Sequence, residues 1–203
     1  IHRTSDWAVI DSVALDKQDI HYLYSLTHDS SIQLTLFDEE HYFVVGETPS
    51  PIVVRDTGYV FTSPTEISLE EAVSGKYTMF QAMFLAEKET VDFFEEKYAS
   101  DICQHFSGVR SQDVIYEVMP AGVTKAFALE RLAQKLNIKV EEIMALGDAN
   151  NDLEMLKFAG LGIAMGNASD YVKSLADNVT DSNDENGVAK AIETLTKTKA
   201  IYQ

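Results

Sequence analysis

The feature that most constrains the fold is a change of pattern near Ala121, after which helix and strand signatures alternate. Apolar residues first recur at the spacing of one helix face, at Leu129, Leu132, Ala133 and Leu136. Residues Ile143 to Leu146 then form a short, continuous apolar stretch. Such a stretch is typical of a strand in a parallel sheet with helices on both faces, because neither of its faces meets water.

The alternation continues toward the end of the chain. It predicts a helix with Leu153, Met155, Leu156 and Ala159, a strand at Leu161 to Met165, a helix near residues 169–176, a short strand near Val179, and a last helix carrying Val188, Ala191, Ile192 and Leu195. Gly160, Gly162 and Gly166 lack the last spacing of a dinucleotide fingerprint, so we expect them to permit close backbone packing. This region is predicted to be half of a doubly wound α/β domain.

Residues 1 to 120 have a different texture. Their patterns predict short strands within residues 1–14, a helix over 16–28, a hairpin around the acidic turn Asp38-Glu39-Glu40, a strand within 77–86 that follows a Pro-containing link, a helix beginning near Lys88, and strands at 102–108 and 114–120. Antiparallel strands with helices on one face, an α+β sandwich, is the packing that these elements favour.

Polar side chains crowd the end of the apolar strand at Ile143 to Leu146. Asp148 follows the strand almost directly, and Asn151 and Asp152 come at the start of the next helix. Ligands of open α/β sheets gather at the carboxyl ends of the strands. Carboxylates there suit Mg²⁺, and an asparagine amide can donate to a phosphate oxygen without adding negative charge. The stretch predicts a phosphate–Mg²⁺ site, with a well-capped turn as the alternative.

Lys125 adds to this hypothesis. It lies at the start of its helix, where a cation opposes the helix dipole at a cost of roughly 0.3–1 kcal/mol. A bound phosphate would turn that cost into an attraction. The alternative is a solvated lysine on the surface. Because Lys125 and the Asp148 cluster both precede helices of one sheet, both can face the same pocket.

Composition limits the classes of partner and compartment. The net charge of −17 argues against nucleic acid or an anionic membrane as the main partner. It allows a phosphorylated substrate, since a divalent cation can reverse the local charge. Cys103 is the only cysteine, which excludes a disulfide within one chain and suits a reducing compartment. With no apolar run of membrane-spanning length and no signal peptide, a cytoplasmic location is expected.

Three stretches together resemble a known family. They are "GVTKAFALERLAQKLNI", "EEIMALGDANNDLEMLKFAGLGIAMGNA" and "NDENGVAKAIE", which cover the chain almost continuously from about Gly122 to Glu193. They are similar to the carboxy-terminal half of the haloacid dehalogenase (HAD) superfamily, and specifically to its Cof-type, class IIB sugar-phosphate phosphatases. Residues 1 to 120 fit more loosely, as a hairpin leading out of the core and an inserted cap.

The resemblance implies a fold, an activity and roles for four residues. The fold is α/β, a Rossmann-like HAD core with an inserted α+β class IIB cap, and the activity is Mg²⁺-dependent hydrolysis of small phosphorylated metabolites such as sugar phosphates. Lys125 resembles the catalytic lysine that pairs the nucleophile and the substrate phosphate, and Asn151 resembles the residue that hydrogen-bonds that phosphate. Asp148 resembles the acidic Mg²⁺ ligand, and Asp152 the second acid that supports the metal. In this family an aspartate attacks phosphorus and forms an aspartyl-phosphate that water then hydrolyses.

The sequence departs from the family in one respect. The family's nucleophile and acid/base lie in an Asp-x-Asp motif on the first core strand, and no Asp-x-Asp occurs in the 203 residues. We therefore expect an incomplete core. Residues 1–14 would be core, 15–118 the cap, and 119–203 the carboxy-terminal half of the core. Such a chain would not turn over substrate alone, and its unpaired strand edges would make it unstable. The alternative is a catalytically inactive, phosphate-binding or regulatory remnant of a phosphatase.

Overall fold

The computed structural model describes residues 1–29 and 31–201, with side chains outside that description at residue 29 and at residues 195–201, which include the predicted apolar Leu195. The chain divides into two compact units, Ile1–Val123 and Thr124–Gln203. Within the described part, no helix is both long and apolar enough to cross a membrane. The assignment of residues 1–14 to a core domain stays a prediction.

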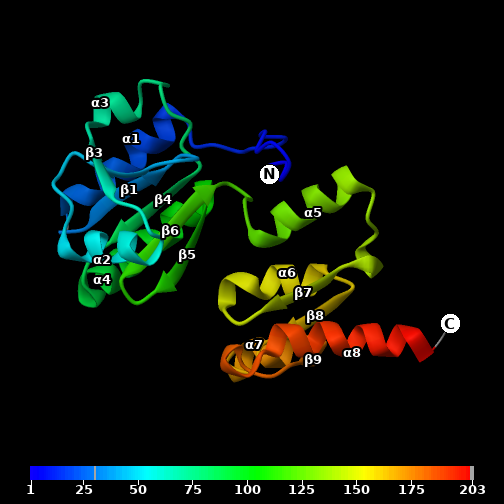
Figure 1. Ribbon diagram of the computed structural model, residues 1–203. Helices are drawn as coiled ribbons and strands as arrows, with labels where there is room; N and C mark the ends of the chain where they lie inside the picture. Colours follow the sequence, from blue (N-terminus) through cyan, green and yellow to red (C-terminus); the bar gives the residue numbers. More distant parts are fainter. Residues whose placement is uncertain (30, 202–203) are drawn as a thin grey trace. The chain divides into compact units, whose positions relative to one another are not determined.

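The first unit is built on a mixed sheet (Figure 1). Its strands, among the described residues, are β1 (Gln33–Phe37), β2 (Tyr42–Val45), β3 (Pro64–Ile67), β4 (Gln81–Leu85), β5 (Phe106–Gln112) and β6 (Ile115–Pro120). They lie in the order β3-β2-β1-β4-β6-β5, antiparallel except for the β2–β3 pair. The predicted hairpin is β1–β2, with Thr35 opposite Val44 across the acidic turn.

Helices cover both faces of this sheet. They are α1 (Lys17–Ser25), η1 (Leu26–Asp29), α2 (Pro51–Tyr59), α3 (Leu69–Ala72) and α4 (Lys88–His105). Alternate strand residues such as Leu34 and Phe84 pack with α1, α3 and α4 in one core. Val53 of α2 packs with the opposite set, including Val44 and Met83. The prediction of helices on one face alone is therefore wrong.

Helix α2 was missed although its start carries a readable signal. Ser50 caps the helix by accepting a hydrogen bond from the Val53 N–H, and Pro51 occupies the first helical position. The sequence pattern predicts only a Pro-containing link here, because a single apolar run, Ile52–Val54, gives too little periodicity for a helix. Strand β3 and helix α3 were missed in the same stretch.

Two predicted strands differ from the structure. Residues 1–14 form one isolated bridge, His2 with Val9, instead of strands, and Trp7 and Val9 are exposed. Their apolar side chains therefore mark no buried strand in this structure. Ile102 belongs to α4, where it shares a buried face with Phe94, and the strand begins at Phe106. A short apolar run that crosses an element boundary cannot reveal the boundary from its composition.

The second unit confirms the predicted alternation. Its helices are α5 (Lys125–Leu136), η2 (Val140–Glu142), η3 (Asn150–Asp152), α6 (Leu153–Phe158), α7 (Asp170–Leu175), η4 (Asn183–Glu185) and α8 (Gly187–Ile201), and its strands are β7 (Met144–Gly147), β8 (Leu161–Ala164) and β9 (Asn178–Val179). The strands are parallel in the order β7-β8-β9. A Cβ at Gly162 would lie 2.1 Å from the Leu156 carbonyl oxygen, which confirms close backbone packing.

One edge of this small sheet is unpaired among the described residues, and the apolar stripe of α5 is only partly buried. No strand in the described residues pairs with the second edge of β7. On α5 the predicted apolar stripe is only partly buried, since Ala133 is buried while Leu132 is 36% and Leu136 is 57% exposed. The apolar stripe of α5 is therefore longer than the part of it that is buried within this unit.

The different burial of Leu156 and Leu136 predicts different costs for truncating the two side chains. We expect Leu156→Ala, at a buried position of α6, to lower the free energy of unfolding by about 2–5 kcal/mol. Leu136→Ala should cost about 0.5 kcal/mol or less, because its side chain is already in water. Urea unfolding of both variants measures the difference. A comparable loss at Leu136 would mean that this face of α5 is buried in solution.

Candidate functional site

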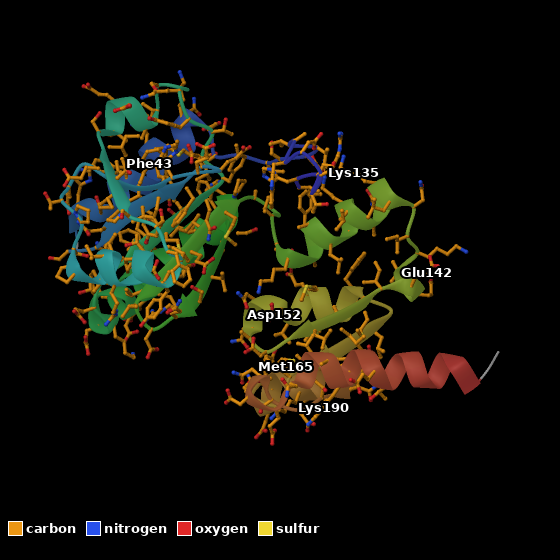
Figure 2. All side chains as sticks on the ribbon, in the orientation of Figure 1. Phe43, Lys135, Glu142, Asp152, Met165 and Lys190 are labelled. Atoms are coloured by element: carbon orange, nitrogen blue, oxygen red, sulfur yellow. The ribbon has the colours of Figure 1, made fainter. Side chains whose placement is uncertain are left out.

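Three of the four predicted site residues line one open pocket of the second unit. The pocket lies at the carboxyl end of β7, and Figure 2 marks Asp152 and Met165 among its residues. Its polar residues are Lys125, Asp148, Asp152, Asn167 and Asn183, and its apolar residues include Leu146, Met155, Met165 and Val188. Asn151 is not among them.

Asp152 is the centre of this pocket. Its side chain is buried, with the whole residue only 4% exposed. Its Oδ2 atom accepts hydrogen bonds from the backbone N–H groups of Asp148 (2.9 Å) and Ala149 (3.1 Å), and its Oδ1 atom lies 2.5 Å from Nζ of Lys125. Both carboxylate oxygens are therefore engaged, one by the loop after β7 and one by the lysine.

These contacts keep the carboxyl of Asp152 ionised. Burial by itself raises the pKa of a carboxyl, because it disfavours the charged form. Here the hydrogen bonds from the Lys125 ammonium and from the N–H groups of Asp148 and Ala149 outweigh burial, and they hold the pKa of Asp152 below its usual value. Asp152 is thus a fixed negative charge near neutral pH.

Gly147 makes this arrangement possible. It is the last residue of β7, and a Cβ built on it would lie 2.4 Å from Cβ of Asp152. Real Cβ atoms do not approach that closely. The Gly147-Asp148 pair therefore has a steric cause, since the buried carboxylate packs directly against the end of the strand.

Lys125 is the first residue of α5, which Thr124 caps by accepting a hydrogen bond from the Phe127 N–H. A cation here opposes the helix dipole. The ion pair with Asp152 offsets that cost and brings α5 to the loop after β7. The Lys125 side chain remains 51% exposed, so its ammonium still faces the open pocket.

Asp148 is oriented differently from Asp152. Its side chain is exposed, and its Oδ2 atom accepts a hydrogen bond of 2.8 Å from the side-chain amide of Asn167. No protein partner for its Oδ1 atom is found in the described residues. Together Asp148, Asp152 and Lys125 carry one more negative charge than positive, so the pocket by itself does not attract an anion.

Asn151 lies in η3, half-buried, between the two aspartates in sequence. Its side-chain oxygen is buried and has no hydrogen-bond partner within residues 1–29 and 31–201. A buried acceptor without a partner costs about 1–3 kcal/mol. The proposed contact of Asn151 with phosphate stays a prediction.

The oxygen atoms of the pocket meet part of what Mg²⁺ coordination requires. This ion takes one or two carboxylates together with waters and substrate phosphates, and it rarely uses a complete cage of protein ligands. Asp148 offers a free carboxylate oxygen, whereas the unpaired oxygen of Asn151 is buried and Asn151 does not line the pocket. Across the part of the chain that the structure describes, no three histidine, cysteine or acidic side chains gather as ligands. The residues fit a partial, open Mg²⁺ site.

Sequence reasoning missed Asn167 and Asn183, which line the same pocket. Asn167 comes three residues after β8, and Asn183 comes four residues after β9. The rule that located Asp148, that polar residues after parallel strands share one edge of the sheet, also applies to these two strands. It was applied to β7 alone because the other two asparagines stand singly.

The contact at Gly147 predicts a local steric effect. We expect Gly147→Ala to lower the free energy of unfolding by about 1–3 kcal/mol, because the added methyl group must displace the Asp152 side chain. The matched control is Gly58→Ala within α2, where a Cβ meets nothing within 4 Å. That change should be neutral or stabilising by up to about 1 kcal/mol. Equal effects in urea unfolding would contradict the steric explanation.

The lowered pKa of Asp152 predicts a pH dependence. Its ionised form contributes stability above the pKa of an unfolded aspartate, about 3.9, and this contribution is lost as the pH falls through the lower folded pKa. Asp152→Asn should therefore cost about 1–3 kcal/mol at neutral pH, with the difference from the native chain shrinking at acidic pH.

The control for this pH series is Asp170→Asn, which changes an exposed carboxylate in the first turn of α7. It should cost less than about 1 kcal/mol. Unfolding free energies measured between about pH 3 and 7 report both variants. A cost for Asp152→Asn that stays constant across that range would show that the carboxylate charge is not what stabilises the loop.

Known proteins are similar to this chain in sequence. YxeH of Bacillus subtilis (strain 168) is 30% identical over 199 residues, which are 98% of this chain and 73% of that protein. The 5-amino-6-(5-phospho-D-ribitylamino)uracil phosphatase YcsE of the same organism is 55% identical over 76 residues, 37% of this chain and 30% of that protein.

Solved structures are also similar to this chain. A haloacid dehalogenase-like hydrolase from Bacteroides thetaiotaomicron superposes with a TM-score of 0.81 at 26% identity, covering 94% of this chain and 71% of that one. A phosphatase of the haloalkanoate (HAD) enzyme superfamily from the same organism has a TM-score of 0.77 at 35% identity, with 93% and 68% covered. The model of the haloacid dehalogenase-like hydrolase family matches residues 1–192. The chain belongs to the haloacid dehalogenase-like hydrolase family.

Proposed function

We propose that this chain carries the metal-binding and phosphate-binding half of a Mg²⁺-dependent phosphatase that acts on small phosphorylated metabolites such as sugar phosphates. The observation that carries the proposal is the pocket in which Lys125, Asp148 and Asp152 meet at the end of β7. Membership of a hydrolase family and similarity to YcsE, a phosphatase of a phosphorylated metabolite, support the same reaction class.

The charges of the pocket support a requirement for a cation. A phosphate monoester carries about two negative charges near neutral pH, and the pocket has a net negative charge of its own. Asp148, with one free carboxylate oxygen, is the residue that would hold Mg²⁺, and Asp152 is the second acid that supports the metal. When bound, Mg²⁺ supplies the positive charge that a transferring phosphoryl group needs.

The residues of the chain have separable roles in this proposal. Lys125 presents its ammonium to a phosphate oxygen, and Asp152 fixes that ammonium while its other oxygen holds the loop that carries Asp148. Asn151 donates its side-chain amide to the phosphate and adds no negative charge. Asp152 supports the metal site indirectly, by holding Lys125 and the loop that carries Asp148, since both of its oxygens are already engaged by the protein.

We propose that the nucleophile of this reaction lies outside these residues. No Asp-x-Asp occurs among the 203 residues, and the chain spans 73% of YxeH and 71% of one of the similar structures. We therefore propose that the second unit is the carboxy-terminal half of a Rossmann-like core. Residues 15–118 are proposed as its α+β cap. The open edge of β7 is consistent with a core strand that these residues do not supply.

The test is release of phosphate from a generic aryl phosphate by the complete protein, with and without Mg²⁺. Asp148→Asn should lower kcat/KM at least about 100-fold, because metal ions contribute several kcal/mol of transition-state stabilisation. Asp170→Asn, at an exposed carboxylate on α7, should leave kcat/KM within about twofold. Absence of release, or release that Asp148→Asn does not change, would contradict the proposal and favour an inactive phosphate-binding protein.

A further inference from the structure

Asn167 is held at both ends of its carboxamide. Its Nδ2 atom donates a hydrogen bond of 2.8 Å to Oδ2 of Asp148, and its Oδ1 atom accepts one of 3.0 Å from the Asn183 N–H. The three residues come from three loops, which follow β7, β8 and β9. One side chain therefore connects the ends of all three strands beside the pocket.

The loops that carry these contacts are themselves packed backbone to backbone. The Gly166 N–H donates to the Asp181 carbonyl at 3.0 Å, and a Cβ at Gly166 would lie 2.6 Å from the Ser182 nitrogen. A Cβ at Gly187 would lie 2.0 Å from the same Asp181 carbonyl oxygen. Asn167 thus extends from closely packed backbone, and its amide is held by the Asn183 N–H as well as by Asp148.

The Asn167 amide has a defined effect on Asp148. It occupies one carboxylate oxygen, leaving the Oδ1 atom without a protein partner in the described residues. It adds no charge, so the carboxylate keeps its full attraction for a cation. This hydrogen bond restricts the rotation of the exposed Asp148 side chain at the edge of the pocket.

We propose that Asn167 is a positioning residue that orients the Asp148 carboxylate for a divalent cation. The inference rests on the proposed function, because it assumes that Asp148 is a metal ligand. Partners that orient metal-binding carboxylates affect metal affinity by about 10- to 100-fold.

The competing role for Asn167 is structural. Its two hydrogen bonds also tie loops together, so removing them would lower stability whether or not Asp148 binds a metal. A structural role changes the melting temperature and leaves the affinity for Mg²⁺ alone. A positioning role changes the affinity, and a longer carboxamide should recover part of it, because the exposed position has room for one more methylene group.

The experiment is calorimetric titration of the full chain with Mg²⁺ alone, together with a thermal melt of each variant. Asn167→Ala should weaken Mg²⁺ binding about tenfold or more, and Asn167→Gln should recover part of that loss. The matched control is Asn178→Ala, at an exposed asparagine of β9, which should bind as the unchanged chain does. Asp148→Asn reports on the metal ligand itself.

The titration distinguishes a failure of the positioning role of Asn167 from a failure of the proposed metal site. If Asp148→Asn abolishes Mg²⁺ binding while Asn167→Ala lowers only the melting temperature, the positioning role is overturned and the proposed metal site stands. If Asp148→Asn leaves Mg²⁺ binding unchanged, or the unchanged chain binds none, the metal site and the role of Asn167 are both overturned.

Discussion

The second unit depends on the buried carboxylate of Asp152. Taking a carboxylate out of water costs several kcal/mol unless charge and hydrogen bonds compensate. Here two backbone N–H groups and the Lys125 ammonium do so. The same contacts fix the loop after β7 and the start of α5. A group that would be unfavourable alone becomes the point at which a strand end, a loop and a helix meet.

The geometry around Asp152 explains why the two aspartates of the pocket differ. Asp152 packs against Gly147, where no Cβ would fit, and its oxygens face the protein. Asp148 stands at the rim, with one oxygen held by Asn167 and the other open. One aspartate thus organises the site while the other is available to a ligand. Position in the fold, and not residue type, sets this division.

Much of the second unit could be predicted because its signals are local. Continuous apolar strands between amphipathic helices identify a parallel sheet from the sequence, and Asp148 can be placed at a strand end by counting residues. The first unit was less predictable. Its short apolar runs fit a helix or a strand equally well, as Ile102 shows, and the helix at Pro51–Tyr59 covers a sheet face whose apolar residues alternate with those of the other face.

By itself the sequence determined the order of strands and helices after Ala121 and the spacing that puts Asp148, Asn151 and Asp152 in one turn. The tertiary structure decided which side chains of the site contact one another. Lys125 lies 27 residues from Asp152, and Asn167 lies 19 residues from Asp148, so neither contact is within the reach of local periodicity. Lys125 meets Asp152 because α5 packs against η3. Asp148 meets Asn167 because β7 and β8 are parallel neighbours whose carboxyl ends share one edge of the sheet. That adjacency follows from hydrogen bonding between strands distant in sequence, which no short stretch of residues encodes.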